Sequence, residues 1–161
     1  MSELPEMVRA LMEPGIYPEP PSSVEMMQTQ MSLVFLAGDY VYKIKKPVDL
    51  GYLDYTTLQK RKFYCQREVD LNRRLCPEAY LGVVNINQDK DVFSIDGKGK
   101  TLEYAVKMLN LPQDRMLNVL LPKGEATPEM IAGVARKMAD FHEKAATNET
   151  IIPVPPSGRP R

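Results

Sequence analysis

The chain has 161 residues and a mass of 18.3 kDa, which suits one domain of ordinary size or a part of a larger protein. Hydrophobic residues make up 43% and charged residues 26% of it, and the balance of 21 basic against 21 acidic residues argues against a sequence-independent nucleic-acid binder, which needs a basic excess. No apolar run reaches the roughly 18 residues that span a bilayer, and the N-terminal sequence has no signal-peptide pattern, so we expect a cytoplasmic protein with neither nucleic acid nor membrane as a partner.

The first predicted elements are a helix, a connector and three strands. Apolar residues at helical spacing predict a helix over residues 4–13, which Pro14 and Gly15 end. Residues 16–23 (IYPEPPSS) are rich in proline and predict an extended connector. The stretches VEMMQTQ, SLVFLA and YVYKIKK predict strands over 24–30, 32–37 and 40–46, and Gly38 allows a short turn between the last two.

A loop, a second helix and three further strands are expected next. Thr56 followed by Gln59 is a capping-box pattern, which predicts a helix from there to about Leu75. Cys65 and Cys76, the only cysteines, both fall in this predicted helix, where their separation corresponds to roughly 16 Å of rise, so we expect two buried thiols rather than a disulfide. The stretches YLGVVNI, DVFSI and TLEYAVKML predict strands over 80–86, 91–95 and 101–109.

Two helices and a tail complete the predicted chain. Pro112 is expected to open a short helix that ends at residues 122–124, and Thr127 before Pro128 predicts the start of a helix that reaches about Ala146. The proline-rich tail, residues 147–161, is expected to be disordered. This order of elements predicts an α+β fold, with an antiparallel sheet and one helix inserted after its third strand.

Lys43 in the third predicted strand is the first candidate functional residue. Alternation along the strand places Val41, Lys43 and Lys45 on one face. A lysine beside Val41 can bury its stem and direct its ammonium group into a cleft. The alternative is a snorkelling or edge-strand lysine, an interpretation that fits Lys45 and Lys46 well.

Glu68 in the second predicted helix is the next candidate. At 100° per residue it lies on the margin of the apolar stripe around Cys65, where a carboxylate is costly unless a cation or hydrogen-bond donors meet it. Its candidate partners are Arg61 and Asn72 on the same helix and Lys43 from the sheet. The alternative is a surface glutamate paired with Arg61 or with solvent.

A strand lysine held by a helix glutamate suggests an arrangement that binds nucleotide phosphates. The motifs VYKIKKP, GYLDYTTLQKR and LNRRLCPEAYLGVV, followed by EYAVKM and ADFH, closely resemble the N-terminal kinase-like domain of bacterial proteins related to aminoglycoside phosphotransferases, which often carry a C-terminal P-loop ATPase-like domain. The resemblance covers nearly the whole chain. It implies an N-terminal helix and connector (1–23), a protein-kinase-like nucleotide-binding N-lobe (24–110) and the start of a helical C-lobe (111–146) before the tail.

The resemblance also implies a binding site for ATP. In it, Lys43 is the phosphate-binding lysine, Glu68 is its partner, Val41 helps to cover the adenine, and the backbone from Met108 to Asn110 is the hinge that bonds the adenine edge. The family usually has Thr-His-x-Ser before the second strand, where this chain has residues 29–32 (TQMS). Because the histidine is missing, only Ser32 of this turn is kept as a candidate phosphate contact.

The implied activity is transfer of the ATP γ-phosphate to a hydroxyl of a small-molecule acceptor, with Mg²⁺ as cofactor. In this family the catalytic-loop aspartate and the magnesium ligands come after the helix that ends here at 139–142 (ADFH), and no such motif follows it in this chain. We therefore expect no catalytic or metal-binding residue in the chain, and no activity without a C-terminal half or an oligomeric partner. His142, the only histidine, is interpreted as a core residue at a helix end. The alternative function is a non-catalytic nucleotide-binding or protein-interaction module.

Overall fold

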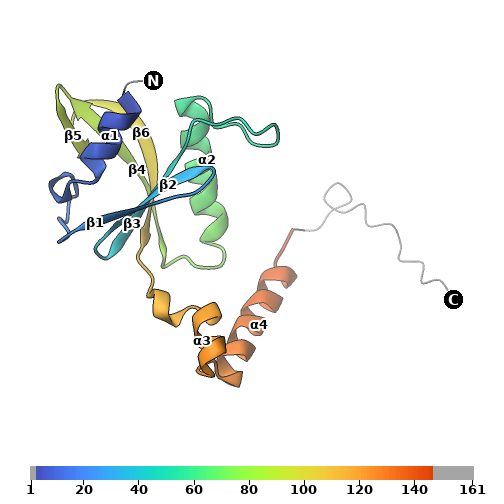
Figure 1. Cartoon of the computed structure of the whole chain (residues 1–161). Coiled ribbons are helices and arrows are strands. Elements are labelled where there is room, and N and C mark those ends of the chain that lie inside the picture. The colour runs from blue at the N-terminus through green and yellow to red at the C-terminus, as the bar shows by residue number, and fades with distance from the viewer. Residues whose placement is uncertain (1–2, 147–161) are drawn as a thin grey trace. The chain divides into compact units, whose positions relative to one another are not determined.

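The computed structural model of the chain describes residues 3–146 (Figure 1). Two compact units make up the chain, one ending at Gln113 and the other beginning at Asp114. The predicted disorder of the tail, residues 147–161, lies outside the described residues.

The first unit is built on a six-stranded sheet in which every neighbouring pair is antiparallel, in the order β1-β2-β3-β6-β4-β5. The last strand therefore lies between the third and the fourth. The strands are β1 (Val24–Gln28), β2 (Ser32–Ala37), β3 (Tyr40–Lys45), β4 (Tyr80–Asp89), β5 (Val92–Ile95) and β6 (Lys100–Leu109). With one helix between β3 and β4, this arrangement confirms the predicted α+β class with an antiparallel sheet and an inserted helix.

A tight turn joins β2 to β3, as predicted from Gly38. This residue has a φ of +62°, a left-handed conformation that glycine adopts without steric cost, and a Cβ atom added here would lie 3.3 Å from the Cβ of Pro21. The backbone of the hairpin therefore favours glycine here, and the connector leaves little room for a larger side chain.

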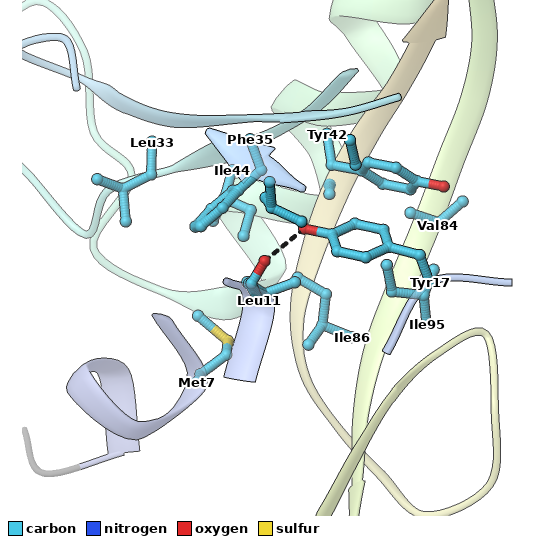
Figure 2. Packing of buried hydrophobic residues seen from close by; sticks show 13 residues of the cluster. Met7, Leu11, Tyr17, Leu33, Phe35, Tyr42, Ile44, Val84, Ile86 and Ile95 are labelled. Carbon is cyan, nitrogen blue, oxygen red and sulfur yellow. Dashed lines mark hydrogen bonds between the residues drawn. The ribbon is translucent and has the colours of Figure 1, made fainter. Parts of the chain in front are cut away.

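Helix α1 (Glu3–Leu11) and the short 3₁₀ helix η1 (Pro14–Ile16) belong to the larger hydrophobic core, on one face of the sheet (Figure 2). Met7 and Leu11 are buried there with Tyr42 and Ile44 of β3. Tyr17 joins them: its hydroxyl donates a 2.6 Å hydrogen bond to the carbonyl oxygen of Leu11, and its ring centroid lies 4.9 Å from that of Tyr42. The connector is thus held against the core although it has no regular secondary structure.

Helix α2 (Leu58–Asn72) covers the opposite face of the sheet. Cys65 and Val69 are fully buried against Val106 of β6. Because side chains alternate along a strand, the face of β3 that carries Lys43 is turned toward α2 while Tyr42 points into the other core. The predicted division of the third strand into two faces is therefore confirmed.

The ends of α2 differ from the prediction. The N-cap is Thr57, whose hydroxyl oxygen accepts a bond from the backbone N–H of Lys60 at 3.2 Å, whereas the hydroxyl of Thr56 donates to Asp54 at 2.6 Å. The helix ends at Asn72, so Cys76 lies beyond it and the helical spacing used to exclude a disulfide does not apply. Both thiols are nevertheless free; Cys65 is buried as predicted, and Cys76 is only partly buried.

A 3₁₀ turn, η2 (Gln113–Arg115), and two helices follow the sheet. Helix α3 (Leu117–Lys123) begins five residues after Pro112, so the prediction that this proline opens the helix is wrong. Helix α4 (Pro128–Glu143) has the predicted N-cap, because the hydroxyl oxygen of Thr127 accepts a bond from the Met130 N–H at 3.3 Å. Between residues 3 and 146, no helix combines the length and the apolar character needed to cross a membrane.

The side chain of His142 near the end of α4 is exposed. Its interpretation as a core histidine is therefore wrong. The interpretation assumed that the apolar face of α4 is covered, but Ile131, Val134 and Met138 are exposed in the structure.

Candidate functional site

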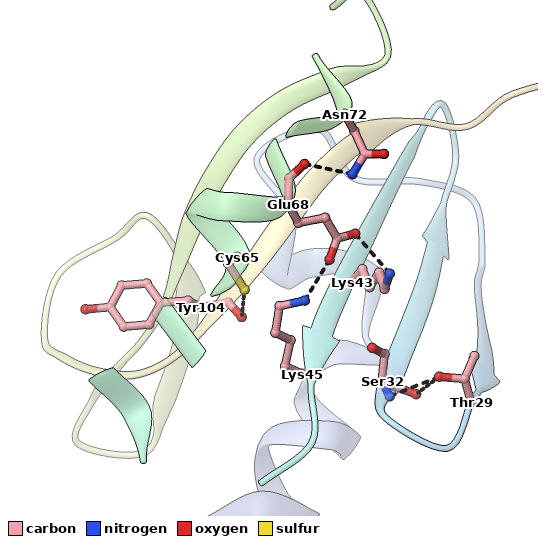
Figure 3. Close-up of polar contacts among 8 residues, drawn as sticks. All are labelled: Thr29, Ser32, Lys43, Lys45, Cys65, Glu68, Asn72 and Tyr104. Carbon is pink, nitrogen blue, oxygen red and sulfur yellow. Dashed lines mark hydrogen bonds and ion pairs between the residues drawn. The ribbon is translucent and has the colours of Figure 1, made fainter. Parts of the chain in front are cut away.

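Two lysines of β3 share one glutamate of α2 (Figure 3). The Nζ atom of Lys43 lies 2.9 Å from Oε1 of Glu68, and the Nζ atom of Lys45 lies 2.7 Å from Oε2. The anticipated contact between Lys43 and Glu68 is therefore present. The interpretation of Lys45 as a snorkelling or edge-strand lysine is wrong, because β3 lies inside the sheet and the Lys45 side chain is only 5% exposed.

Local periodicity explains how these residues meet. Lys43 and Lys45 are two residues apart on one strand, so both ammonium groups project from the same face toward α2. Glu68 is three residues after Cys65 and one before Val69, which places it at the edge of the buried stripe of the helix. The Asn72 side chain donates to the backbone carbonyl of Glu68 at 2.8 Å and does not bond its carboxylate.

Arg61, the other anticipated partner of Glu68, bonds elsewhere. Its Nε donates to Oε2 of Glu103 on β6 at 2.8 Å, and its Nη1 donates to the backbone oxygens of Tyr55 at 2.9 Å and Thr56 at 3.1 Å. The pair of Arg61 and Glu103 is buried and fastens the start of α2, and the loop before it, to the sheet. Sequence reasoning missed this pair, although Arg61 is four residues before Cys65 and so lies on the buried stripe.

The ion pair favours the charged forms of Lys45 and Glu68. Burial by itself lowers the pKa of the Lys45 ammonium, but the hydrogen bond and the charge of Glu68 outweigh it, so the net pKa is raised. Burial likewise raises the pKa of Glu68, but the bonds and charges of Lys45 and Lys43 outweigh it, so the net pKa is lowered. Two ammonium groups and one carboxylate leave the cluster with one excess positive charge, which favours an anionic ligand.

An apolar row crosses the sheet next to Lys43, on the same face. The pairing register aligns Leu36 of β2, Val41 of β3, Met108 of β6 and Tyr80 of β4. Val41 is buried and is two residues before Lys43, so the row lies on the side of Lys43 away from Lys45. The face thus presents apolar side chains directly beside an ammonium group.

The segment from Met108 to Asn110 uses part of its backbone within the protein. The N–H of Leu109 donates to the Ala79 oxygen at 2.9 Å, and the N–H of Asn110 donates to the Asp39 oxygen at 2.8 Å. The Asn110 side chain also donates to the Gly38 oxygen at 2.9 Å. In this conformation neither of these two N–H groups is free to donate to a ligand.

Ser32 lies at the start of β2, opposite Lys45 in the pairing register and not opposite Lys43. Its N–H donates to Oγ1 of Thr29 at 3.0 Å, and the N–H of Thr29 donates to the Ser32 oxygen at 2.9 Å. These two bonds close the turn between β1 and β2, and Ser32 itself is buried at the edge of the cluster (Figure 3).

A surface cavity of about 360 Å³ lies elsewhere on the first unit, at the N-terminal end of α2. It is lined by Asp54, Gln59, Lys60, Phe63 and Tyr64, and none of the anticipated site residues reaches it. Asp54 and Lys60 form an ion pair there. Across residues 3–146 we find no group of three or more His, Cys, Asp or Glu side chains that could hold a metal ion.

Comparison with known proteins finds relatives over most of the chain but indicates no function. The uncharacterised proteins Rv2004c of Mycobacterium tuberculosis and Mb2027c of Mycobacterium bovis are each 30% identical to it over 128 residues, which is 80% of this chain. The chain spans only 24%, or about a quarter, of the length of these curated relatives. No family model matches the sequence, and no solved structure matches it.

Proposed function

We propose that residues 24–110 form the nucleotide-binding N-lobe of a kinase-like, ATP-dependent phosphotransferase. The observation that carries the proposal is the ion pair between Lys43 of β3 and Glu68 of α2, because a strand lysine held by a helix glutamate is the arrangement with which kinases bind ATP phosphates. The sequence resemblance to bacterial aminoglycoside-phosphotransferase relatives supports the same function.

Lys43 is the residue proposed to contact the phosphates. Its side chain is 31% exposed, so its ammonium group can reach a ligand. The excess positive charge of the cluster attracts a polyphosphate. A divalent ion bound to the nucleotide neutralises part of the phosphate charge, but no residue of this chain is assigned to hold that ion.

The apolar row beside Lys43 is proposed to pack against the nucleobase. Val41 is two residues, or about 6.6 Å, along β3 from Lys43, so a base on the row leaves its phosphates near the lysine. Met108 and Tyr80 extend the row toward the segment after β6, where the backbone from Met108 to Asn110 is proposed to lie near the base edge.

The acceptor is proposed to be a hydroxyl of a small molecule, bound by parts of the protein that this chain does not contain. The chain carries no catalytic-loop aspartate motif after α4 and spans about a quarter of its curated relatives, so we expect it to bind nucleotide without transferring phosphate by itself.

Thermal unfolding of the chain with and without magnesium-ATP tests the proposal. At a nucleotide concentration about a hundred times the dissociation constant, binding adds roughly 2.7 kcal/mol to the free energy of unfolding and raises Tm. Lys43→Met is expected to lose this shift, and Lys46→Met, the same change at a lysine that bonds the Thr29 oxygen, is expected to keep it. A well-folded parent chain with no shift would overturn the proposal.

A second candidate is a non-catalytic interaction module. It is favoured by the exposed apolar side chains of α4, namely Ile131, Val134 and Met138. Self-association without any effect of magnesium-ATP would select this candidate.

A further inference from the structure

The two lysines that bond Glu68 are not equivalent. The Lys45 side chain is 5% exposed, and the Lys43 side chain is 31% exposed, although both ammonium groups lie within 3 Å of the same carboxylate. Lys45 is therefore cut off from solvent by its surroundings, whereas Lys43 stands at the edge of the cluster.

The loop before α2 encloses Lys45. The Nζ atom of Lys45 lies 4.9 Å from the ring centroid of Tyr55, and the backbone of Tyr55 is held by Arg61, which is itself bonded to Glu103. The Cys65 thiol is also close enough to interact with the Lys45 charge, and burial raises the pKa of that thiol to about 12. Glu68 is the only carboxylate that bonds Lys45 among the described residues, so the buried ammonium has no other anion to move to.

Each lysine bonds a different oxygen of the Glu68 carboxylate. Lys45 occupies Oε2 and Lys43 occupies Oε1, so the departure of Lys43 leaves Glu68 bonded and charged. With a single lysine, the movement of that lysine toward a phosphate would leave a partly buried carboxylate without a partner, which is unfavourable.

We propose that Lys45 is a positioning residue that holds Glu68 permanently in place, so that Lys43 can exchange between Glu68 and the phosphate of a bound nucleotide. The ligand part of this inference rests on the proposed nucleotide site; the division of roles between the two lysines does not. Lys45 contacts no ligand and acts through Glu68.

The titration of the Glu68 carboxyl group tests the division of roles without any ligand. Carboxyl-¹³C NMR follows it in the parent chain, in Lys43→Met and in Lys45→Met. The other titratable groups that interact with the cluster include Tyr55, Cys65 and Tyr80, none of which is a carboxyl group, and burial raises the pKa of Cys65 and of Tyr80.

We expect the Glu68 pKa to stay below its ordinary value in Lys43→Met and to be about one unit or more higher in Lys45→Met, a tenfold change in proton affinity. Equal values in the two variants, or the reverse order, would overturn the proposal. A lysine that served packing alone would not produce this difference.

If Lys45→Met does not fold, variants built on Glu68→Gln test the same division of roles. Glu68→Gln leaves Lys45 buried without its anion, so adding Lys45→Met to it is expected to raise Tm, whereas adding Lys43→Met is expected to have no such effect. If Lys43→Met restores Tm as much as Lys45→Met does, Lys45 is not the permanent partner.

The dissociation constant of magnesium-ATP tests the link to the ligand. Lys45→Met is expected to weaken binding by about tenfold although Lys45 does not touch the nucleotide, which corresponds to about 1.4 kcal/mol. Unchanged affinity would remove Lys45 from the site. Absence of ATP binding in the parent chain would instead overturn the proposed function, while the Glu68 titration would still decide between the two lysines.

Discussion

The carboxyl group of Glu68 couples the stability of the chain to pH. Burial raises the pKa of this group, but the bonds from the ammonium groups of Lys45 and Lys43 outweigh burial. The net pKa therefore lies below the ordinary value of 4.5. A carboxyl group whose pKa is lowered by folding stabilises the folded state above its unfolded pKa, and this stabilisation is lost as pH falls through the folded pKa. The contribution is therefore complete at neutral pH and declines below about pH 4.5.

Glu68→Gln is accordingly expected to lower the free energy of unfolding at pH 7 and to lose this effect in acid, where the parent glutamate is protonated and resembles glutamine. Urea unfolding of both proteins between pH 7 and pH 3 measures the difference. Asp54→Asn is a useful comparison, because bonds from Lys60 and Thr56 also lower the pKa of that carboxyl group but it lies outside the cluster. A difference between the parent and Glu68→Gln that is constant across the whole range would contradict the assignment.

The contact between Lys43 and Glu68 could be predicted because each residue is placed by a local repeat. The two-residue period of a strand and the 100° step of a helix determine which faces the two side chains occupy. The burial of Lys45 could not be predicted in this way, since it depends on the closure of the loop that carries Tyr55. The same holds for Arg61, whose partner Glu103 is 42 residues away.

At the scale of elements, the pair of Arg61 and Glu103 connects α2 and the preceding loop to β6. Burial raises the pKa of Glu103, and Arg61 is the charged group that opposes this effect. Arg61→Met leaves the carboxylate buried without its cation, and it also removes the bonds to the Tyr55 and Thr56 oxygens. Removing one partner of a buried ion pair typically costs about 3–5 kcal/mol.

We expect Arg61→Met to lower the free energy of unfolding by about this amount, and the double variant Arg61→Met, Glu103→Gln to recover part of the loss, since no unpaired charge then remains. Urea unfolding at pH 7 measures both. Arg67→Met is the matched control, because Arg67 is exposed on the same helix and its replacement is expected to cost little. A double variant less stable than Arg61→Met would show that the pair is not the origin of the loss.

The boundary of a helix or turn could be predicted where one residue alone determines it. The prediction failed where several residues could each have formed the boundary. Gly38 and the pair of Thr127 and Pro128 define their turn and helix start without competition, and both predictions are confirmed. Thr56 and Thr57 can each cap a helix, and the bond from Thr56 to Asp54 leaves the cap to Thr57. Pro112 suits a first helical position by its φ angle, but a 3₁₀ turn comes before α3 and delays the helix to Leu117.

At the scale of the whole molecule, the fold class follows from the order of elements but the strand order does not. Three strands, a helix and three strands predict an antiparallel sheet with one inserted helix. The position of β6 between β3 and β4 depends on contacts between distant parts of the chain, which no local pattern specifies. This order matters for the proposed site, because it places Met108 of β6 between Val41 and Tyr80.

The exposed apolar side chains of α4 predict self-association of the chain in solution. Met130, Ile131, Val134 and Met138 are between 37% and 49% exposed, and their spacing gathers them on one side of the helix. A contiguous apolar surface of this kind promotes association, because contact between two copies removes it from water. We expect sedimentation velocity to show oligomers of the 161-residue chain that dissociate on dilution.

The double variant Ile131→Lys, Val134→Lys is expected to sediment as a monomer, because two ammonium groups on the apolar side of α4 cannot be buried between copies without a large desolvation cost. Asp140→Asn, Glu143→Gln is the matched control: it changes the net charge by the same two units at exposed positions of the same helix, and it is expected to leave association intact. A monodisperse monomer of the parent chain would contradict the prediction. Equal dissociation of both double variants would attribute association to net charge rather than to the apolar side chains of α4.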